Sequence, residues 1–274
     1  MNFKSIVGFV AATALCFSMV GCASETQDEI EETQVETVSI DAKAIEIDEA
    51  GYSVGADGEV SYAFTMTNPN DGYIADRITF SISGYDADGA MVLGAAESVE
   101  RMFPGIEYAM AGTAFLADNA VIDRIEVTPS MDLVGWIETD ISAADAAEMF
   151  SVVDTRSGRL SDDTVVASGR VVADNIDDIA AAEGVSADAI SAKVCAVLVD
   201  TDGNLIGGGL AEGLVFDEEE GIVHESENMG SDASTAEQAA EKSAEGEVLK
   251  AASFSISITG APGFKECRFY VMPA

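Results

Sequence analysis

Two stretches of the chain carry paired aspartates at a spacing that occurs in calcium-binding loops. Each has the pattern Asp-x-Asp-Gly between apolar segments, and the residues are Asp86, Asp88, Gly89, Asp200, Asp202 and Gly203. Carboxylate oxygens are ligands that calcium prefers. An EF-hand-type loop places oxygen ligands at its first, third and fifth positions, with a bidentate Glu at the twelfth.

Both stretches lack two of these ligands. The first position is Gly84 or Leu198, and the twelfth is Ala95 or Gly209, so no side-chain oxygen is available there. A tight turn between two strands explains the same residues, because Gly tolerates positive φ and Asp favours turns. We therefore interpret both stretches as β-hairpin turns and expect no metal site.

Two cysteines in the second part of the chain could form a disulfide. Cys195 alternates with Val197 and Val199, and Cys267 alternates with Phe269, which predicts that both side chains face a core. If the protein is exported, this pair is compatible with one disulfide, and two buried thiols are the alternative. A redox site is not expected, because no Cys-x-x-Cys spacing is present.

No residue pattern indicates catalysis or a cofactor. The single histidine, His224, lies in an acidic segment without a nucleophile motif elsewhere. Gly207–Gly209 lacks the Lys or Ser/Thr and the helix start of a phosphate loop, and zinc would need more His or Cys. Paired carboxylates for glycoside hydrolysis stay open, because 50 acidic residues make any pairing possible.

The charge of the chain limits its partners. The sequence has 274 residues with 13 Lys and Arg against 50 Asp and Glu, giving a formal net charge of −37. Nucleic acid and anionic lipid headgroups would repel such a chain, whereas a cationic partner would be attracted. We expect no nucleic-acid binding.

The N-terminus has the features of an export signal. Lys4 precedes an apolar run from Ile6 to Val20, which is short for a membrane-spanning helix. The run ends in Met19-Val20-Gly21-Cys22, which resembles the lipobox of bacterial lipoproteins, although Met19 stands where Leu is usual. The resemblance implies that residues 1–21 are removed and that Cys22 is lipidated, which would anchor the protein to a bacterial membrane on its extracytoplasmic side. An ordinary secretory signal is the alternative.

The remaining chain predicts an all-β fold. Residues 22–38 are acidic with few apolar positions and are expected to form a flexible stalk. From residue 39 the period changes to two: Val60, Tyr62, Phe64 and Met66 alternate with small or polar residues, and Gly, Asn and Pro mark turns. Strands and turns at this spacing favour an antiparallel β-sandwich over residues 39–130.

A second sandwich is predicted over residues 150–274, because this half repeats the first. Gly51–Asn68 aligns with Gly158–Asn175, Gly89 falls on Gly203, and Ile125 falls on Phe269. Each sandwich is long enough to bury its own core. The Cys pair has no counterpart in the first copy.

Two segments lie outside this repeat. Residues 131–149 are expected to be a linker with a short helix, which Ser142 caps and in which Asp145 suits the dipole. It is interpreted as a spacer, and the alternative is that it is the first element of the second domain. The insertion 217–247 contains the acidic run Asp217–Glu220 and is expected to be an acidic loop with a brief helix, and a further helical turn is expected at 179–184.

The repeated unit resembles the FxLYD-type domain, an immunoglobulin-like β-sandwich of bacterial envelope lipoproteins. Phe80–Gly89 and Pro104-Gly105 carry the pattern in the first copy. The second copy keeps Asp200–Gly203 but has Val199 in place of Tyr. The resemblance implies two tandem immunoglobulin-like modules outside the cytoplasm, and it supplies no catalytic or metal-binding residue.

These observations predict a membrane-anchored envelope lipoprotein that acts as a binding or structural module without enzymatic activity. Its expected partners are the membrane, through Cys22, and an envelope protein or a cationic partner. The rival interpretation is an envelope hydrolase that uses carboxylates brought together between the two domains. A ligand-free spacer is the third possibility.

Overall fold

Strands make up most of the computed structural model, which describes residues 41–117, 120–132, 134–173, 191–214, 216–219, 249–261 and 263–273. The pairings between its named strands are all antiparallel. The prediction of an all-β, sandwich-like fold is therefore confirmed. The parts of the chain predicted to be signal peptide and stalk lie outside the described residues.

The first half of the body contains two sheets. One has the strand order β1-β2-β5, with β1 at Glu46–Val54, β2 at Glu59–Thr67 and β5 at Glu107–Phe115. The other has the order β4-β3-β6, with β3 at Tyr73–Tyr85, β4 at Met91–Met102 and β6 at Arg124–Ser130. A short strand from the predicted linker, β7 at Gly135–Glu138, pairs with the start of β3.

The second half has the same strand topology. One sheet has the order β12-β13-β9-β8, formed by β8 (Phe150–Arg159), β9 (Thr164–Ala173), β12 (Asp217–Glu219) and β13 (Leu249–Thr259). The other has the order β11-β10-β14, formed by β10 (Ala192–Val199), β11 (Leu205–Leu214) and β14 (Glu266–Pro273). Strands β1 to β6 thus correspond to β8, β9, β10, β11, β13 and β14.

The closing strands of the two halves differ by two residues from the predicted alignment. Gly84 pairs with Ile125 in the first half, and its equivalent Leu198 pairs with Cys267 in the second. Ile125 therefore corresponds to Cys267 rather than to Phe269. Because a shift of two residues preserves the face of a strand, the alternation of side chains conceals it.

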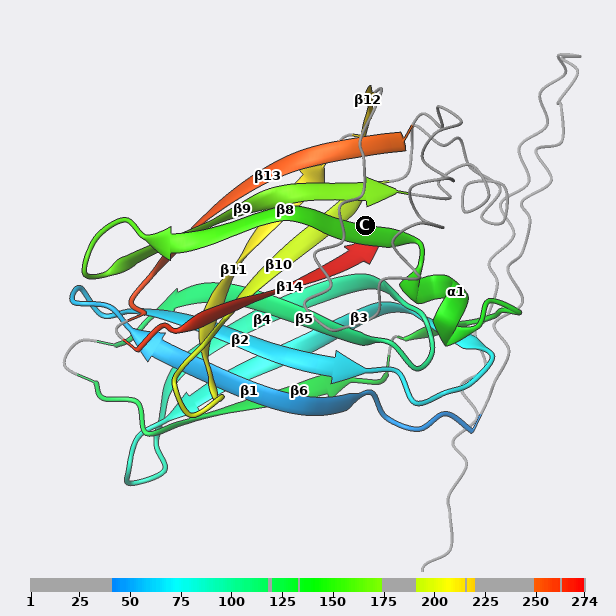
Figure 1. Ribbon diagram of the computed structural model, residues 1–274. Coiled ribbons are helices and arrows are strands. Elements are labelled where there is room, and N and C mark those ends of the chain that lie inside the picture. Colours follow the sequence, from blue (N-terminus) through cyan, green and yellow to red (C-terminus); the bar gives the residue numbers. More distant parts are fainter. Residues whose placement is uncertain are drawn as a thin grey trace, which may run out of the picture. The chain divides into compact units, whose positions relative to one another are not determined.

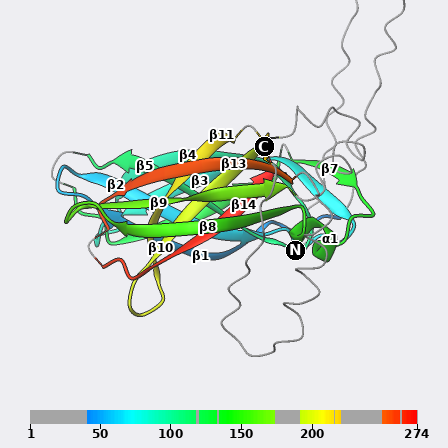
Figure 2. The same cartoon turned by 45° about the horizontal axis from the view of Figure 1, so that its top comes forward.

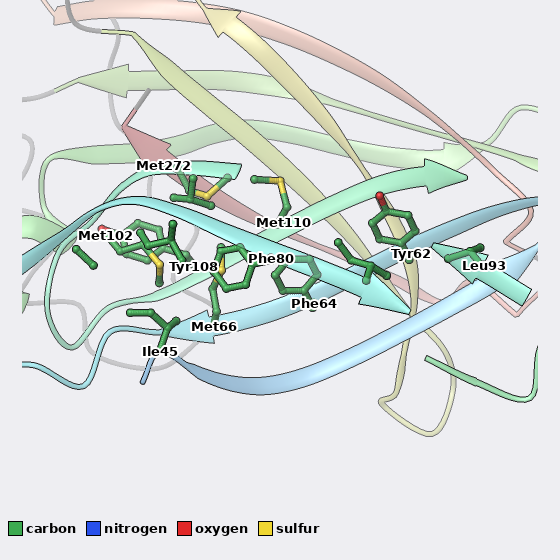
Figure 3. Close-up of a cluster of buried hydrophobic side chains, with 14 of the residues drawn as sticks. Ile45, Tyr62, Phe64, Met66, Phe80, Leu93, Met102, Tyr108, Met110 and Met272 are labelled. Atoms are coloured by element: carbon green, nitrogen blue, oxygen red, sulfur yellow. The ribbon is translucent and has the colours of Figure 1, made fainter. Parts of the chain in front are cut away.

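The core of the first half lies between its two sheets. The alternating residues Val60, Tyr62, Phe64 and Met66 are all buried there, facing Phe80 and other apolar side chains of the opposite sheet (Figure 3). The residues between them on β2, Ser61, Ala63 and Thr65, are also buried. Strand β2 is thus covered on both faces, which a pattern of alternation does not predict.

The second half provides this additional cover. Its sheet β11-β10-β14 packs on the outer face of β1-β2-β5 through a separate apolar cluster that includes Ala63, Ala109, Ala111, Cys195 and Val197. A third cluster fills the space between β11-β10-β14 and β8-β9-β13. Residues of β1 to β14 thus form four layers of sheet within one compact unit, and β10, β11 and β14 run diagonally between the layers on either side (Figures 1 and 2).

The predicted linker helix is present but is not a spacer. Helix α1 spans Ala143–Ala147 and Ser142 caps it, as predicted, and Asp145 completes a capping box with Ser142. Ala146 and Met149 are buried in a cluster with Ile74 of the first half and Ala173 of the second. The spacer interpretation is wrong, because this segment packs against both halves.

The acidic insertion also begins differently from the prediction. Asp217–Glu219 is strand β12, which pairs with Leu249–Ala251 of β13. The rest of the insertion, including His224 and the brief helix expected there, lies outside the described residues, as does the helical turn expected at 179–184. Among the residues described, no helix is long and apolar enough to cross a membrane.

Candidate functional site

The contact between the two halves brings together a cluster of small buried residues, a buried hydrogen-bonded serine and ionisable side chains from both halves. We call it the inter-half contact, and it consists of the outer face of β1-β2-β5, the facing side of β11-β10-β14 and the side chains at their margin. Small residues dominate its centre. Polar and ionisable residues gather at the margin where β4, β10 and β11 meet.

Glycines let the backbones approach closely in the centre of this contact. A Cβ atom added to Gly51 would lie 1.8 Å from the carbonyl oxygen of Leu205. One added to Gly208 would lie 2.9 Å from Ala111 Cβ, and one at Gly209 would lie 2.5 Å from Ile256 Cγ2, on the opposite face of β11. The Gly207–Gly209 run thus serves close packing of three sheets, in keeping with its rejection as a phosphate loop.

A serine side chain joins the two sheets by two hydrogen bonds. Ser61 Oγ donates to the carbonyl oxygen of Gly208 at 3.0 Å and accepts from the amide of the same residue at 3.1 Å. Both groups are buried, so the bonds are shielded from competition with water. The contact therefore has a fixed register as well as an apolar surface.

The margin of the contact holds a cluster of ionisable side chains, which we call the Tyr62 cluster. The hydroxyl of Tyr62 donates to Glu97 Oε1 at 2.5 Å, and both residues belong to the first half. In the second half, Lys193 Nζ lies 2.9 Å from Glu212 Oε1. Gly112 leaves room for the first pair, because a Cβ there would lie 2.3 Å from Glu97 Oε1.

The electrostatics of the Tyr62 cluster couple the halves. Burial raises the pKa of the Glu97 carboxyl, the hydrogen bond from Tyr62 lowers it, and the charges of Glu212 and Lys193 act in opposite directions. The pKa of Tyr62 is also raised, mainly by burial and then by the Glu97 carboxylate. The neutral phenol and the lysine thus stabilise two carboxylates that lie in different halves.

The Tyr62 cluster could serve either catalysis or the stability of the contact. Two nearby carboxylates, one with a raised pKa, are the groups used in general acid–base catalysis. In the Tyr62 cluster each carboxylate is already engaged, Glu97 by a phenol and Glu212 by an ammonium group. The sequence analysis missed this site, and its one signal is Lys193 within the otherwise apolar strand β10.

The two aspartate stretches form hairpin turns, one between β3 and β4 and the other between β10 and β11. Asp86 Oδ1 accepts hydrogen bonds from the amides of Asp88 and Ala90, at 3.0 and 2.8 Å, and Gly89 has a φ of 83°. In the second turn, Asp200 Oδ1 accepts from Asp202 and Asn204 at 2.8 and 3.0 Å, and Gly203 has a φ of 92°. The first aspartate of each pair is thus a turn-forming acceptor.

Hydrogen bonding also affects the acidity of the second turn. Asn204 and the neighbouring backbone amides donate to the Asp200 carboxylate and lower its pKa. In the described part of the chain, no group of three or more His, Cys, Asp or Glu side chains is arranged to hold a metal ion.

The predicted disulfide between Cys195 and Cys267 is wrong. Both are free thiols. Cys195 pairs across the strands with Tyr270, and Cys267 pairs with Leu198, so the two cysteines are three positions apart and face opposite sides of one sheet. Cys195 lies in the inter-half contact, whereas Cys267 packs against the core of the second half. Alternation alone places each side chain toward an apolar layer but does not say which layer.

Comparison with protein-family models finds no match for this chain, and neither does comparison with curated protein sequences.

Proposed function

We propose that this protein is a lipid-anchored, extracytoplasmic module of a bacterial cell envelope, with a binding or structural role. Anchoring at Cys22 is supported by the charged start, the apolar run and the lipobox-like Met19–Cys22. In this proposal residues 22–38 are the stalk, and the two halves are immunoglobulin-like repeats of the FxLYD type. The charge of −37 favours an envelope protein or other cationic partner over nucleic acid.

One observation carries the non-catalytic role. The inter-half contact is filled by backbone and small side chains, with Ser61 hydrogen-bonded to Gly208 and the carbonyl oxygen of Leu205 against Gly51. Hydrolases that work between domains need an open crevice in which substrate meets two carboxylates. A closed and registered contact instead suits a rigid module.

One pair of carboxylates supports the rival function, an envelope hydrolase. Glu97 and Glu212 come from different halves, and the charge of Glu212 raises the pKa of the Glu97 carboxyl. Glu97→Gln and Glu212→Gln should each abolish any glycosidase activity if this interpretation holds. The engagement of both carboxylates by Tyr62 and Lys193 favours the structural role.

Replacement of Cys22 by Ser tests the anchoring. In a bacterial host, the variant should move from the membrane fraction to the soluble extracytoplasmic fraction and should lose incorporation of labelled palmitate. Cys16→Ser is the matched control, because Cys16 lies in the predicted signal peptide and should change neither property. Retention of the Cys22→Ser variant in membranes, with unchanged label, would refute lipid attachment.

A further inference from the structure

Exposed apolar side chains gather at one end of the body. The described residues include six exposed large apolar side chains, and five of them lie in or beside the turns at this end: Val54, Met91, Phe115, Val121 and Leu160. Phe115, Val121 and Leu160 are 68%, 75% and 74% exposed. The sixth, Ile137, lies on β7. Single exposed apolar residues are ordinary, but their concentration at one end is not.

Strand register places these residues together. Phe115 at the end of β5 pairs with Glu59 at the start of β2, and Arg124 at the start of β6 pairs with Tyr85 at the end of β3. The turn between β8 and β9 lies at the same end, because Thr259 of β13 pairs with Thr164 and donates to Glu59 Oε2 at 2.6 Å. We call this the loop end; it is on the left in Figure 1.

Carboxylates surround the apolar side chains at the loop end. The exposed ones in or beside its turns include Asp57, Asp88, Asp123, Asp162 and Asp163. The arginines there bind within the protein: Arg124 pairs with Glu126, and Arg159 donates to two carbonyl oxygens. Lys265 adds one exposed cation. The loop end thus combines apolar side chains with a strong excess of negative charge.

We propose that the loop end is a docking surface for a basic polypeptide segment that also carries apolar side chains. Charge complementarity selects this occupant, because lysines or arginines would meet the aspartates while apolar side chains cover Phe115 and Leu160. A second copy of this chain or an anionic membrane would be repelled by a net charge of −37. The proposal rests on the binding role proposed above, but not on lipid attachment.

Three synthetic peptides test this surface against the full chain, purified in detergent, with detergent alone as the blank. One alternates Lys with Leu, one alternates Lys with Ser, and one alternates Glu with Leu. Fluorescence anisotropy should show binding of the Lys-Leu peptide, weaker binding of the Lys-Ser peptide and none of the Glu-Leu peptide. Equal binding of the two lysine peptides would overturn the apolar part of the proposal.

Variants locate the binding. Phe115→Ser combined with Leu160→Ser should weaken binding of the Lys-Leu peptide by about fivefold or more, as loss of an anchoring side chain does in other interfaces. Ile137→Ser is the control, because it removes an exposed apolar residue elsewhere. An effect on binding equal to that of the control would refute the proposal.

A variant with altered charge tests the same surface even if the Phe115→Ser, Leu160→Ser variant misfolds. Asp88→Asn with Asp162→Asn should also weaken binding, whereas Glu100→Gln with Glu138→Gln should not, and circular dichroism should be unchanged in both. Self-association of the native chain that the apolar variant abolishes would instead assign the surface to a second copy. Failure here leaves the membrane fractionation result for Cys22→Ser unaffected, so the two proposals are tested separately.

Discussion

Glu97 is the ionisable residue with the clearest structural role. Its carboxylate accepts a hydrogen bond from Tyr62 at the margin of the inter-half contact, and burial raises its pKa above the ordinary value of 4.5. A group whose pKa is raised on folding favours the folded state where it is protonated. Its contribution is present below the unfolded-state pKa and is lost as pH rises through the folded-state pKa.

Replacement of Glu97 by Gln should therefore change how stability depends on pH. The amide keeps an oxygen that accepts from Tyr62 but cannot ionise, so the variant should lose less stability than the native protein as pH rises from about 4.5 upward. Urea unfolding at a series of pH values measures this. Glu126→Gln, an exposed carboxylate on β6, is the control, and parallel pH profiles for native protein and Glu97→Gln would contradict the interpretation.

At the scale of elements, the short distance between β1 and β11 depends on a glycine, Gly51, which has no side chain. Gly51 and Gly158 align in the two halves of the sequence, but only Gly51 meets another backbone, that of Leu205. No heavy atom lies within 4 Å of a Cβ added to Gly158. The same residue type therefore has different roles in the two copies.

The two glycines form a matched pair of substitutions. Gly51→Ala should lower the free energy of unfolding by about 1–3 kcal/mol or more, because either sheet must move to admit the methyl group. Gly158→Ala should be neutral or slightly stabilising, because alanine lowers the conformational entropy of the unfolded chain. Thermal and chemical unfolding of both variants compares these values, and equal losses at the two sites would contradict the close approach of β1 and β11.

The elements themselves were predictable from the sequence, but their partners were not. Alternation at Val60–Met66 and the Asp-x-Asp-Gly turns identify strands and hairpins, because these signals are local. Burial of Ser61 and Ala63 depends on a sheet more than a hundred residues away, and small residues look the same whether they face water or another sheet. For the same reason the strand register that separates Cys195 from Cys267 was not predictable.

At the scale of the molecule, the two halves share buried clusters of apolar side chains. Met272 of the last strand is buried in the core of the first half (Figure 3), and the segment around α1 packs against both halves. Residues 37–274 form one compact unit. The structure thus differs from a pair of sandwiches joined by a spacer.

Calorimetry of the native protein should accordingly show one cooperative unfolding transition, with the calorimetric enthalpy close to the van't Hoff enthalpy. Gly51→Ala provides a test within the same experiment, because weakening the inter-half contact should broaden or split that transition. Two well-resolved transitions in the native protein would show that the halves are energetically independent.

The packing of the two halves could in principle continue with a third half, and the residues on the outer sheets explain why it does not. The face β1-β2-β5 meets the face β11-β10-β14, and these are not equivalent sheets, so the same contact could add further repeats without limit, as in a solenoid or filament. The exposed outer faces prevent this. Ala63 and Ala111, buried in the contact, correspond to Arg170 and Ser253 on the outside of the second half, and Cys195 corresponds to exposed Ser81 on the outside of the first. The two outer sheets are therefore polar where the inner sheets are apolar. They cannot repeat the contact with a further sheet, so the packing ends after two halves.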